Sequence, residues 1–167
     1  MTTHTPAPHV RPAREPDIPA IFRLIRALAE YEKLLAAVVA TERDFREALF
    51  PAPPGTRPAA EALLAFSGET VVGFALYFMT FSTFLGRPGI YLEDIFVEPE
   101  YRGRGFGRAL LKRIASIAVE RRCGRVEWSV LTWNQPSIDF YLRLGAEAME
   151  EWRTFRLTGV ALDRLGA

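Results

Sequence analysis

The spacing of apolar and polar positions in the first part of the chain predicts two helices. Apolar residues recur at helical spacing between positions 18 and 29, directly after Asp17, a residue type that caps helix N-termini. A second, shorter helix is predicted to begin at Thr41 and to reach Leu49. The proline-rich segment 51–58 then ends the helical pattern and is interpreted as a connecting loop.

The pattern in the middle of the chain predicts strands. Two apolar runs within 61–81 are separated by "SGET" at 67–70, which predicts a β-hairpin with its turn at those four residues. A further strand is predicted over 89–97, and a short one near Val10 precedes the first helix.

Helices and strands alternate again in the second half. The predicted elements are a helix over 105–121, a strand over 125–131, a helix over 136–144 and a strand over 152–158. The resulting order, βααβββαβαβ, predicts a mixed α/β domain. We expect this single domain to span 10–167, after a disordered leader over 1–9.

Composition excludes several classes of protein. With 167 residues, 49% of them hydrophobic, the chain suits one globular domain with a full core. Its net charge is +1, so we expect no general attraction to nucleic acid or to an anionic membrane. A segment of about 18 apolar residues, which a membrane span requires, does not occur. A single cysteine, Cys123, suits a reducing compartment, and the cytoplasm is the predicted location.

Both histidines fall in the predicted leader, at His4 and His9. Catalytic triads of the Ser-His or Cys-His type therefore lack a component, and so do zinc sites, which need several His or Cys ligands. No metal is expected. Any chemistry must rest on carboxylates, tyrosine, backbone dipoles or a bound cofactor.

The stretch "YRGRGFGRALLKR" over 101–113 places alternating glycines between a predicted strand and a predicted helix. A dinucleotide fingerprint would need glycine where the chain has Arg108, and the Lys-Ser or Lys-Thr of a nucleotide P-loop is missing. What remains is a tight turn whose bare N–H groups and helix N-terminus suit a pyrophosphate, with Arg102, Arg104 and Arg108 adding charge at its rim. The alternative is an ordinary glycine-rich turn with solvated arginines. Nucleic-acid binding is disfavoured because the rest of the chain is not basic.

The motif R-x-x-G-x-G over 102–107 resembles the coenzyme A loop of the GNAT acetyltransferases. Together, "YLEDIFVEPEYRGRGFG" and "WNQPSIDFYLRLGA" resemble more narrowly the spermidine/spermine acetyltransferase branch, with its thialysine-acetylating relatives. The similarity runs from Val10 to Arg156 and includes "LIRALAEYEKL" and "GFALYF". It implies the GNAT fold, with a mostly antiparallel central sheet flanked by helices. It also implies acetyl-CoA as donor, a small-molecule amine as acceptor and a homodimer.

Two acidic residues interrupt the apolar strand "GIYLEDIFV". An unpaired carboxylate is costly to bury, and adjacent residues of a regular strand point to opposite faces, so at most one of Glu93 and Asp94 would face the core. They could also mark a solvated strand end. The resemblance favours Glu93 as the base that accepts the amine proton, directly or through water, with Asp94 beside it.

Tyr141 is the candidate proton donor for the leaving thiolate. In "NQPSIDFYLRLG", Asn134 or Gln135 can cap a helix, and Tyr141 then shares a face with Ser137, four residues earlier. By pattern alone a tyrosine here is more typical of a core or interface. The resemblance assigns it the general-acid role.

The resemblance also implies a set of cofactor contacts. The predicted acetyl-CoA-binding residues are Ile95, Phe96, Val97, Arg102, Gly103, Arg104, Gly105, Phe106, Gly107, Arg108, Asn134, Ser137, Tyr141 and Arg143. The first three are expected to act through their backbone, which pairs with the pantetheine arm and supplies the oxyanion donor. Their side chains are expected to be ordinary core residues.

The amine pocket is expected to include Tyr31 and Glu32 as well as the two strand carboxylates. The chain departs from the polyamine enzymes where Ser82 and Thr83 replace an acidic residue and Gln135 replaces a glutamate. Less acidity weakens selection for several positive charges, so a lysine-like or small primary amine is favoured over long polyamines. The alternatives are a non-catalytic acetyl-CoA sensor, and acetylation of a protein N-terminus or an aminoglycoside.

Overall fold

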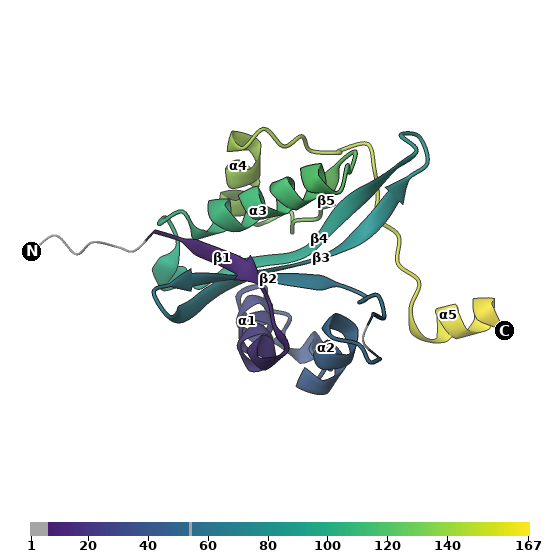
Figure 1. Ribbon diagram of the computed structural model, residues 1–167. Helices are drawn as coiled ribbons and strands as arrows, with labels where there is room; N and C mark the ends of the chain where they lie inside the picture. Colours follow the sequence, from purple (N-terminus) through teal and green to yellow (C-terminus); the bar gives the residue numbers. More distant parts are fainter. Residues whose placement is uncertain (1–6, 54) are drawn as a thin grey trace, which may run out of the picture. The chain divides into compact units, whose positions relative to one another are not determined.

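The computed structural model describes residues 7–53 and 55–167, and the chain divides into two compact units, Met1–Ser129 and Val130–Ala167. The first unit holds a five-stranded sheet (Figure 1). Its strands are β1 (His9–Pro12), β2 (Glu61–Ser67), β3 (Thr70–Ser82), β4 (Arg87–Val97) and β5 (Val126–Trp128). They lie side by side in chain order, antiparallel except for the parallel pair β4–β5. The predicted α/β class with a mixed, mostly antiparallel sheet is confirmed.

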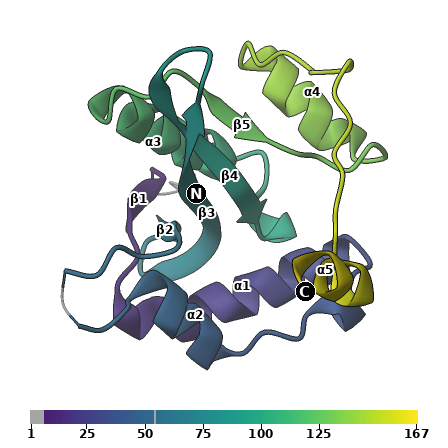
Figure 2. The same ribbon diagram turned by 90° about the vertical axis from the view of Figure 1, so that its right-hand side faces the viewer.

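Three helices cover the two faces of this sheet. Helices α1 (Ile18–Tyr31) and α2 (Glu42–Leu49) lie against one face, and α3 (Phe106–Glu120) lies against the other (Figure 2). Side chains alternate along the strands accordingly: in β2, Leu64 packs with the α1 core and Leu63 with the α3 core, and both are fully buried. The sheet is thus a central layer with a hydrophobic core on each face.

Local sequence explains where these elements begin and turn. Thr41 caps α2, because its side-chain oxygen accepts the Asp44 N–H while the Asp44 carboxylate accepts the Thr41 N–H. Asp17 stands at the N-cap position of α1, but its carboxylate binds Arg11 at 2.7 and 3.0 Å instead of capping the helix. The predicted hairpin forms, with Gly68 at a positive φ of 62° between β2 and β3.

The second unit contains α4 (Gln135–Arg143) and α5 (Gly159–Gly166). The prediction of a strand over 152–158 is wrong, and α5 was not predicted. A strand forms only where a neighbouring strand supplies ladder hydrogen bonds. Within the described residues, no strand pairs with this segment. Its aromatic side chains, Trp152 and Phe155, are exposed. The strand predicted over 125–131 is also shorter than expected, because β5 is only three residues long.

The N-terminal boundary differs slightly from the expected one. His9, the last residue of the predicted leader, already pairs with Phe66 as the first residue of β1. Residues 1–6 of that leader lie outside the described residues. Across the described chain, no helix combines the length and the apolar character that crossing a bilayer requires.

Candidate active site

A bulge in β4 shapes the first part of the candidate site. Leu76 of β3 pairs with Asp94, whereas the next residue, Tyr77, pairs with Leu92, so Glu93 is an extra residue on β4. The bulge resets the alternation of side chains. Leu92 packs in the α3 core, while Asp94, two residues before Phe96, shares the face that α1 covers. The simple expectation that Glu93 and Asp94 point to opposite faces of a regular strand therefore does not apply.

Pairing between β4 and β5 ends at the same place. The parallel ladder runs from Ile90 with Val126 to Leu92 with Trp128 and includes no later pair. Within the described residues, the segment 93–97 thus has β3 on one side and no strand on the other. A free strand edge offers N–H and C=O groups that an extended, amide-containing ligand can pair with. The predicted pantetheine strand, Ile95 to Val97, lies on this edge.

The glycine loop lies between β4 and α3. Gly103 and Gly105 have φ angles of 73° and 88°, a backbone conformation that suits glycine and strains other residues. A Cβ on Gly103 would meet no atom within 4 Å, and one on Gly105 would meet only Pro8, at 3.7 Å. Gly105 is also the N-cap of α3, which has no side-chain cap. The first N–H groups of α3, from Phe106 and Gly107 onward, have no partner within the helix and suit phosphate oxygens.

The three arginines of this loop are exposed but do not behave alike. Arg104 stacks over the Tyr101 ring at 5.4 Å, and Arg108 lies on the first turn of α3. Arg102 folds back toward the sheet. Its Nε donates a 2.9 Å hydrogen bond to the Val97 carbonyl, and its guanidinium lies 4.5 Å from the centre of the Tyr31 ring. The sequence gives no signal for this contact between α1 and the loop.

Three carboxylates gather where α1 ends beside the bulge. Glu32 and Asp94 are half-buried, and Glu93 is exposed. Burial, together with repulsion from Glu93 and Glu32, raises the pKa of Asp94 to about 6. Burial also raises the pKa of Glu32. Since no hydrogen bond or ion pair among the described residues offsets these charges, a cationic group would relieve their repulsion.

Tyr31 forms the aromatic side of this acidic corner. Its ring lies 6.4 Å from that of Phe96, and it packs against the core on the α1 face. The structure thus brings together four predicted residues of the amine pocket, Tyr31, Glu32, Glu93 and Asp94, at the end of α1 and the bulge of β4. Ile95 is half-buried, and Phe96 and Val97 are buried, as expected of core side chains.

The remaining predicted residues lie in the second unit. Asn134 is the N-cap residue of α4 and is buried, although its side chain does not cap the helix. Ser137, Tyr141 and Arg143 lie on α4, and the four-residue spacing of the first two puts them on one helix face. Gln135 donates a 2.7 Å hydrogen bond to Asp139, one turn along the helix. The predicted roles of these residues stay predictions.

The positions of Ser82 and Thr83 weaken one argument about the substrate. Ser82 is buried at the end of β3, and its hydroxyl accepts the Leu85 N–H at 3.3 Å, which closes the β3–β4 turn. Its partner across the hairpin is Arg87, six residues from the bulge at Glu93. Six strand residues span about 20 Å. Within one chain, residues 82 and 83 therefore lie far from the carboxylates of Glu93 and Asp94. The lack of an acidic residue at 82–83 gives no reason to disfavour polyamines.

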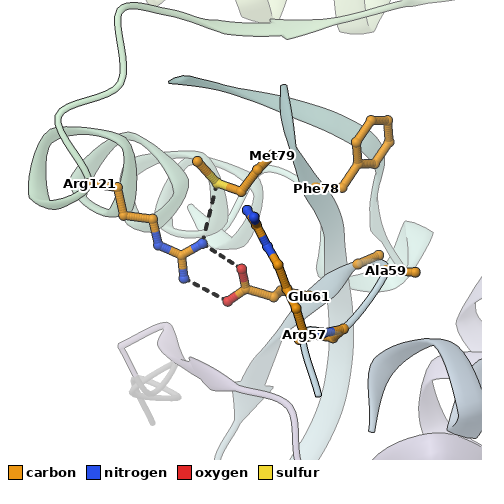
Figure 3. Close-up of a pocket in the computed structure, with 8 residues that line it drawn as sticks. Arg57, Ala59, Glu61, Phe78, Met79 and Arg121 are labelled. Carbon is orange, nitrogen blue, oxygen red and sulfur yellow. Dashed lines mark hydrogen bonds and ion pairs between the residues drawn. The ribbon is translucent and has the colours of Figure 1, made fainter. Parts of the chain in front are cut away.

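A separate pocket of about 350 Å³ lies at the other end of α3 (Figure 3). Its main feature is an ion pair in which Arg121 donates to Glu61 at 2.7 Å, and the Tyr77 hydroxyl also donates to Glu61, at 3.2 Å. The Arg121 hydrogen bond lowers the pKa of Glu61, and burial raises that of Tyr77 to about 12. The pair joins the start of β2 to the end of α3. Because Glu61 and Arg121 neutralise each other, this ion pair is best explained as a structural tie.

Comparison with known proteins identifies the same fold and chemistry. The model of the acetyltransferase (GNAT) family matches residues 22–146. The thialysine N-epsilon-acetyltransferase of Bos taurus is 41% identical over 163 residues, which cover 93% of this chain and 95% of that protein. The L-ornithine N5-acetyltransferase of Arabidopsis thaliana is 34% identical over 205 residues, covering 98% and 90%.

A solved structure extends the comparison to the fold. An integron cassette protein from the mobile metagenome of V. cholerae has a TM-score of 0.77 with this chain and 24% identity. The match covers 96% of this chain and 98% of that one. The likeness spans both units of the chain.

Proposed function

Because this chain belongs to the GNAT acetyltransferase family and is an acetyl-CoA-dependent N-acetyltransferase, we propose that its acceptor is a small amino acid with a terminal amine. Thialysine and ornithine, the substrates named for two relatives, are of this class. The observation that carries the proposal is the acidic corner formed by Glu32, Glu93 and Asp94 beside Tyr31. A cationic amine would be drawn to these carboxylates, and the methylene chain that bears it can pack on the Tyr31 ring.

Polyamines form the second candidate class. A human relative, spermidine/spermine N(1)-acetyltransferase-like protein 1, is 36% identical over 88% of this chain, although the match covers only 22% of that longer protein. Three carboxylates would also suit a substrate with several ammonium groups. We favour the amino acid class because the relatives that match this chain over most of their own length act on thialysine and ornithine.

The donor site in this proposal combines the glycine loop with the free edge of β4. Backbone N–H groups of Gly103 to Gly107 and the uncapped start of α3 hold the pyrophosphate, with Arg104 and Arg108 adding positive charge. The open space at Gly103 fits this use, because a Cβ placed there would meet no atom within 4 Å. Asn134, Ser137 and Arg143 supply further contacts from the second unit.

The proposed reaction needs a base for the amine and a proton donor for the thiolate. Glu93 accepts a proton from the ammonium, directly or through water, so that the neutral amine nitrogen can attack the thioester carbon. A backbone N–H of the segment 95–97 donates to the oxyanion of the tetrahedral intermediate. The attached nitrogen gives up its second proton to solvent, the carbon–sulfur bond breaks, and Tyr141 gives its phenolic proton to the leaving thiolate. Solvent exchange afterwards returns the proton to Tyr141 and removes it from Glu93.

We further propose that the protein is a cytoplasmic homodimer. The support for the dimer is the second unit, where large apolar side chains between 149 and 165 are exposed. They are Met149, Trp152, Phe155, Leu157, Val160, Leu162 and Leu165. An apolar surface of this kind is typical of a protein–protein interface. Sedimentation of the purified chain at micromolar concentration tests this, and a monomer would contradict it.

Thiol release from acetyl-CoA, followed with a panel of amines, tests the proposed activity. The panel is thialysine, ornithine, lysine, spermidine, spermine, putrescine and an aminoglycoside, with the mass of each product measured. We expect the highest kcat/KM with thialysine or ornithine. A preference for spermidine would support the polyamine class instead. Acetyl-CoA binding without any thiol release would favour a sensor or an acceptor outside the panel, such as a protein N-terminus.

A further inference from the structure

Arg102 occupies an unusual place for a residue of a phosphate-binding loop. It follows the short 3-10 helix Pro99–Tyr101, and its side chain turns back to the end of β4. There the Nε–H donates to the carbonyl of Val97, the last residue of that strand. The backbone of the loop and the strand edge are therefore held together by this side chain.

The same guanidinium also reaches α1. Its central carbon lies 4.5 Å from the centre of the Tyr31 ring and 5.4 Å from the centre of the Phe96 ring, both within range of a cation–π contact. Tyr31 is the last residue of α1 and is followed by Glu32 of the acidic corner. Tyr31 also contacts Phe96 on the inner face of the strand. Arg102 thus joins the end of α1, the end of β4 and the start of the loop.

We propose that Arg102 is a positioning residue that couples the amine pocket to the acetyl-CoA loop. The inference rests on the proposed function, since that function defines the two pockets. A donor that orders the loop would also fix Arg102, and through it the Tyr31 side of the amine pocket. An amine packed on Tyr31 would in turn stabilise the loop, because coupling between two binding sites is reciprocal.

The neighbouring loop arginine provides a comparison. Arg104 stacks on Tyr101, a residue of the adjoining 3-10 helix, and among the described residues it has no hydrogen bond, ion pair or ring contact with α1. If each arginine merely bound phosphate, replacing either would raise the KM for acetyl-CoA and leave the KM for the amine unchanged. If Arg102 couples the two pockets, replacing Arg102 should change both KM values, and replacing Arg104 should change only the KM for acetyl-CoA.

The test uses Arg102→Lys, which keeps the charge but loses the planar stack and the Nε–H. Comparators are Arg104→Lys and Arg26→Lys. Arg26 stacks on Phe22 at 5.9 Å, away from the loop, and its variant controls for the loss of a surface cation–π contact. We expect Arg102→Lys to raise the KM of both the amine and acetyl-CoA by about tenfold. Arg104→Lys should raise only that of acetyl-CoA. An unchanged amine KM in Arg102→Lys would overturn the proposal.

A double-mutant cycle separates coupling from general damage. Tyr31→Leu removes the ring, whereas Tyr31→Phe keeps its face and should keep the coupling. We expect Tyr31→Leu to lower kcat/KM for the amine by about tenfold, and its combination with Arg102→Lys to be little worse than either change alone. A loss of about a hundredfold in the double variant would show that the two residues act independently and would contradict the inference. Thermal melts of each variant confirm folding.

A readout without turnover keeps this inference distinct from the proposed function. Tyr31 belongs to the predicted amine pocket, yet Tyr31→Leu should weaken acetyl-CoA binding severalfold in calorimetry, because it loosens Arg102. An unchanged Kd would refute the coupling. If the wild-type protein acetylated no amine but Tyr31→Leu still weakened acetyl-CoA binding, the proposed acceptor would be wrong and the coupling would stand.

Discussion

The two halves of β4 differ although they belong to one strand. From Ile90 to Leu92 the strand pairs with β3 on one side and β5 on the other, and Ile90 and Leu92 are fully buried in the α3 core. Glu93 is the extra residue, and from Asp94 to Val97 the strand pairs, among the described residues, with β3 alone, so this half carries two carboxylates. One inserted residue separates the halves. The first half stabilises the sheet, and the second leaves a backbone edge and charged groups available to ligands.

This difference shows how the fold produces a site without a long insertion. A regular strand would continue its ladder with β5 and hide its backbone groups. The bulge at Glu93 coincides with the end of that ladder at Leu92, and the glycine loop begins five residues beyond Val97. The open strand edge, two of the carboxylates of the proposed amine pocket and the glycine loop therefore lie within about fifteen residues of sequence.

The largest effect on folding should come from the fully paired half. Leu92→Ala removes a side chain that is 1% exposed, and we expect a loss of about 3 kcal/mol in the free energy of unfolding. Ile95→Ala, in the open half, should cost about 1 kcal/mol because Ile95 is only half-buried. Urea denaturation measures both. Equal losses would show that the two halves do not differ in their contribution to stability.

The glycine loop should have the largest effect on ligand binding. Gly105→Asp places a side chain and a negative charge where the proposed pyrophosphate lies, on a backbone with a φ of 88°. We expect acetyl-CoA affinity to fall by about 100-fold or more. Gly68→Asp is the matched control, because Gly68 also has a positive φ and open space but lies in the β2–β3 turn. Equal affinity in the two variants would remove the loop from the donor site.

Each of the two proposed proton-transfer residues should contribute a factor of about 100 to kcat. Glu93→Gln and Tyr141→Phe each remove one of them, and we expect kcat to fall by about 100-fold in both, with acetyl-CoA affinity nearly unchanged. Glu127→Gln, which changes a half-buried glutamate on β5 paired with Arg125, is the control for the first variant. Stopped-flow thiol release and calorimetry separate rate from binding. Unchanged turnover in either variant would exclude that residue from the mechanism.

Replacing Asp94 should have a smaller effect, which is on the KM for the amine and depends on pH. Its pKa is about 6 in the folded chain and 3.8 as the ordinary value, so it is ionised at neutral pH and becomes neutral as pH falls through 6. Asp94→Asn should therefore raise the amine KM by about tenfold at pH 8 and much less at pH 5. An equal effect at both values would show that the Asp94 charge does not contact the amine.

The raised pKa of Asp94 also predicts that Asp94→Asn stabilises the fold, although the same change weakens amine binding. A carboxyl group whose folded pKa is raised weakens folding once pH rises above about 4, and the full penalty is present above about 6. We expect the variant to gain about 1 kcal/mol at pH 8, after allowance for solvent screening, and nothing below pH 4. Thermal melts at the two pH values check the sign. A gain at low pH alone would contradict it.

Much of this architecture can be predicted from the sequence. Helical spacing located α1 and α2, "SGET" located the first hairpin, and the glycine motif located the start of α3. These features depend on local contacts and on backbone conformations that particular residues favour. The resemblance carried by the loop and by "WNQPSIDFYLRLGA" identified the family, which the matched family model confirms.

The features that sequence did not predict depend on partners distant in the chain. The bulge arises from how β3 and β4 pair, and "LED" shows only that acids interrupt an apolar strand. The contact of Arg102 with Tyr31 joins residues 71 positions apart, which no local pattern reveals. The segment 152–158 has strand-like composition but no strand beside it among the described residues, so its composition alone misled the prediction.

The most direct test of the account is amide hydrogen exchange with and without acetyl-CoA. The edge of 93–97 and the N–H groups of 103–108 should exchange more slowly when the donor is bound, whereas 87–92, already paired on both sides over its last three residues, should not change. Protection confined to these two segments would place the donor at the open half of β4. Protection of neither segment, in a protein shown by calorimetry to bind acetyl-CoA, would contradict the central claim that this half of the strand and its glycine loop form the donor site.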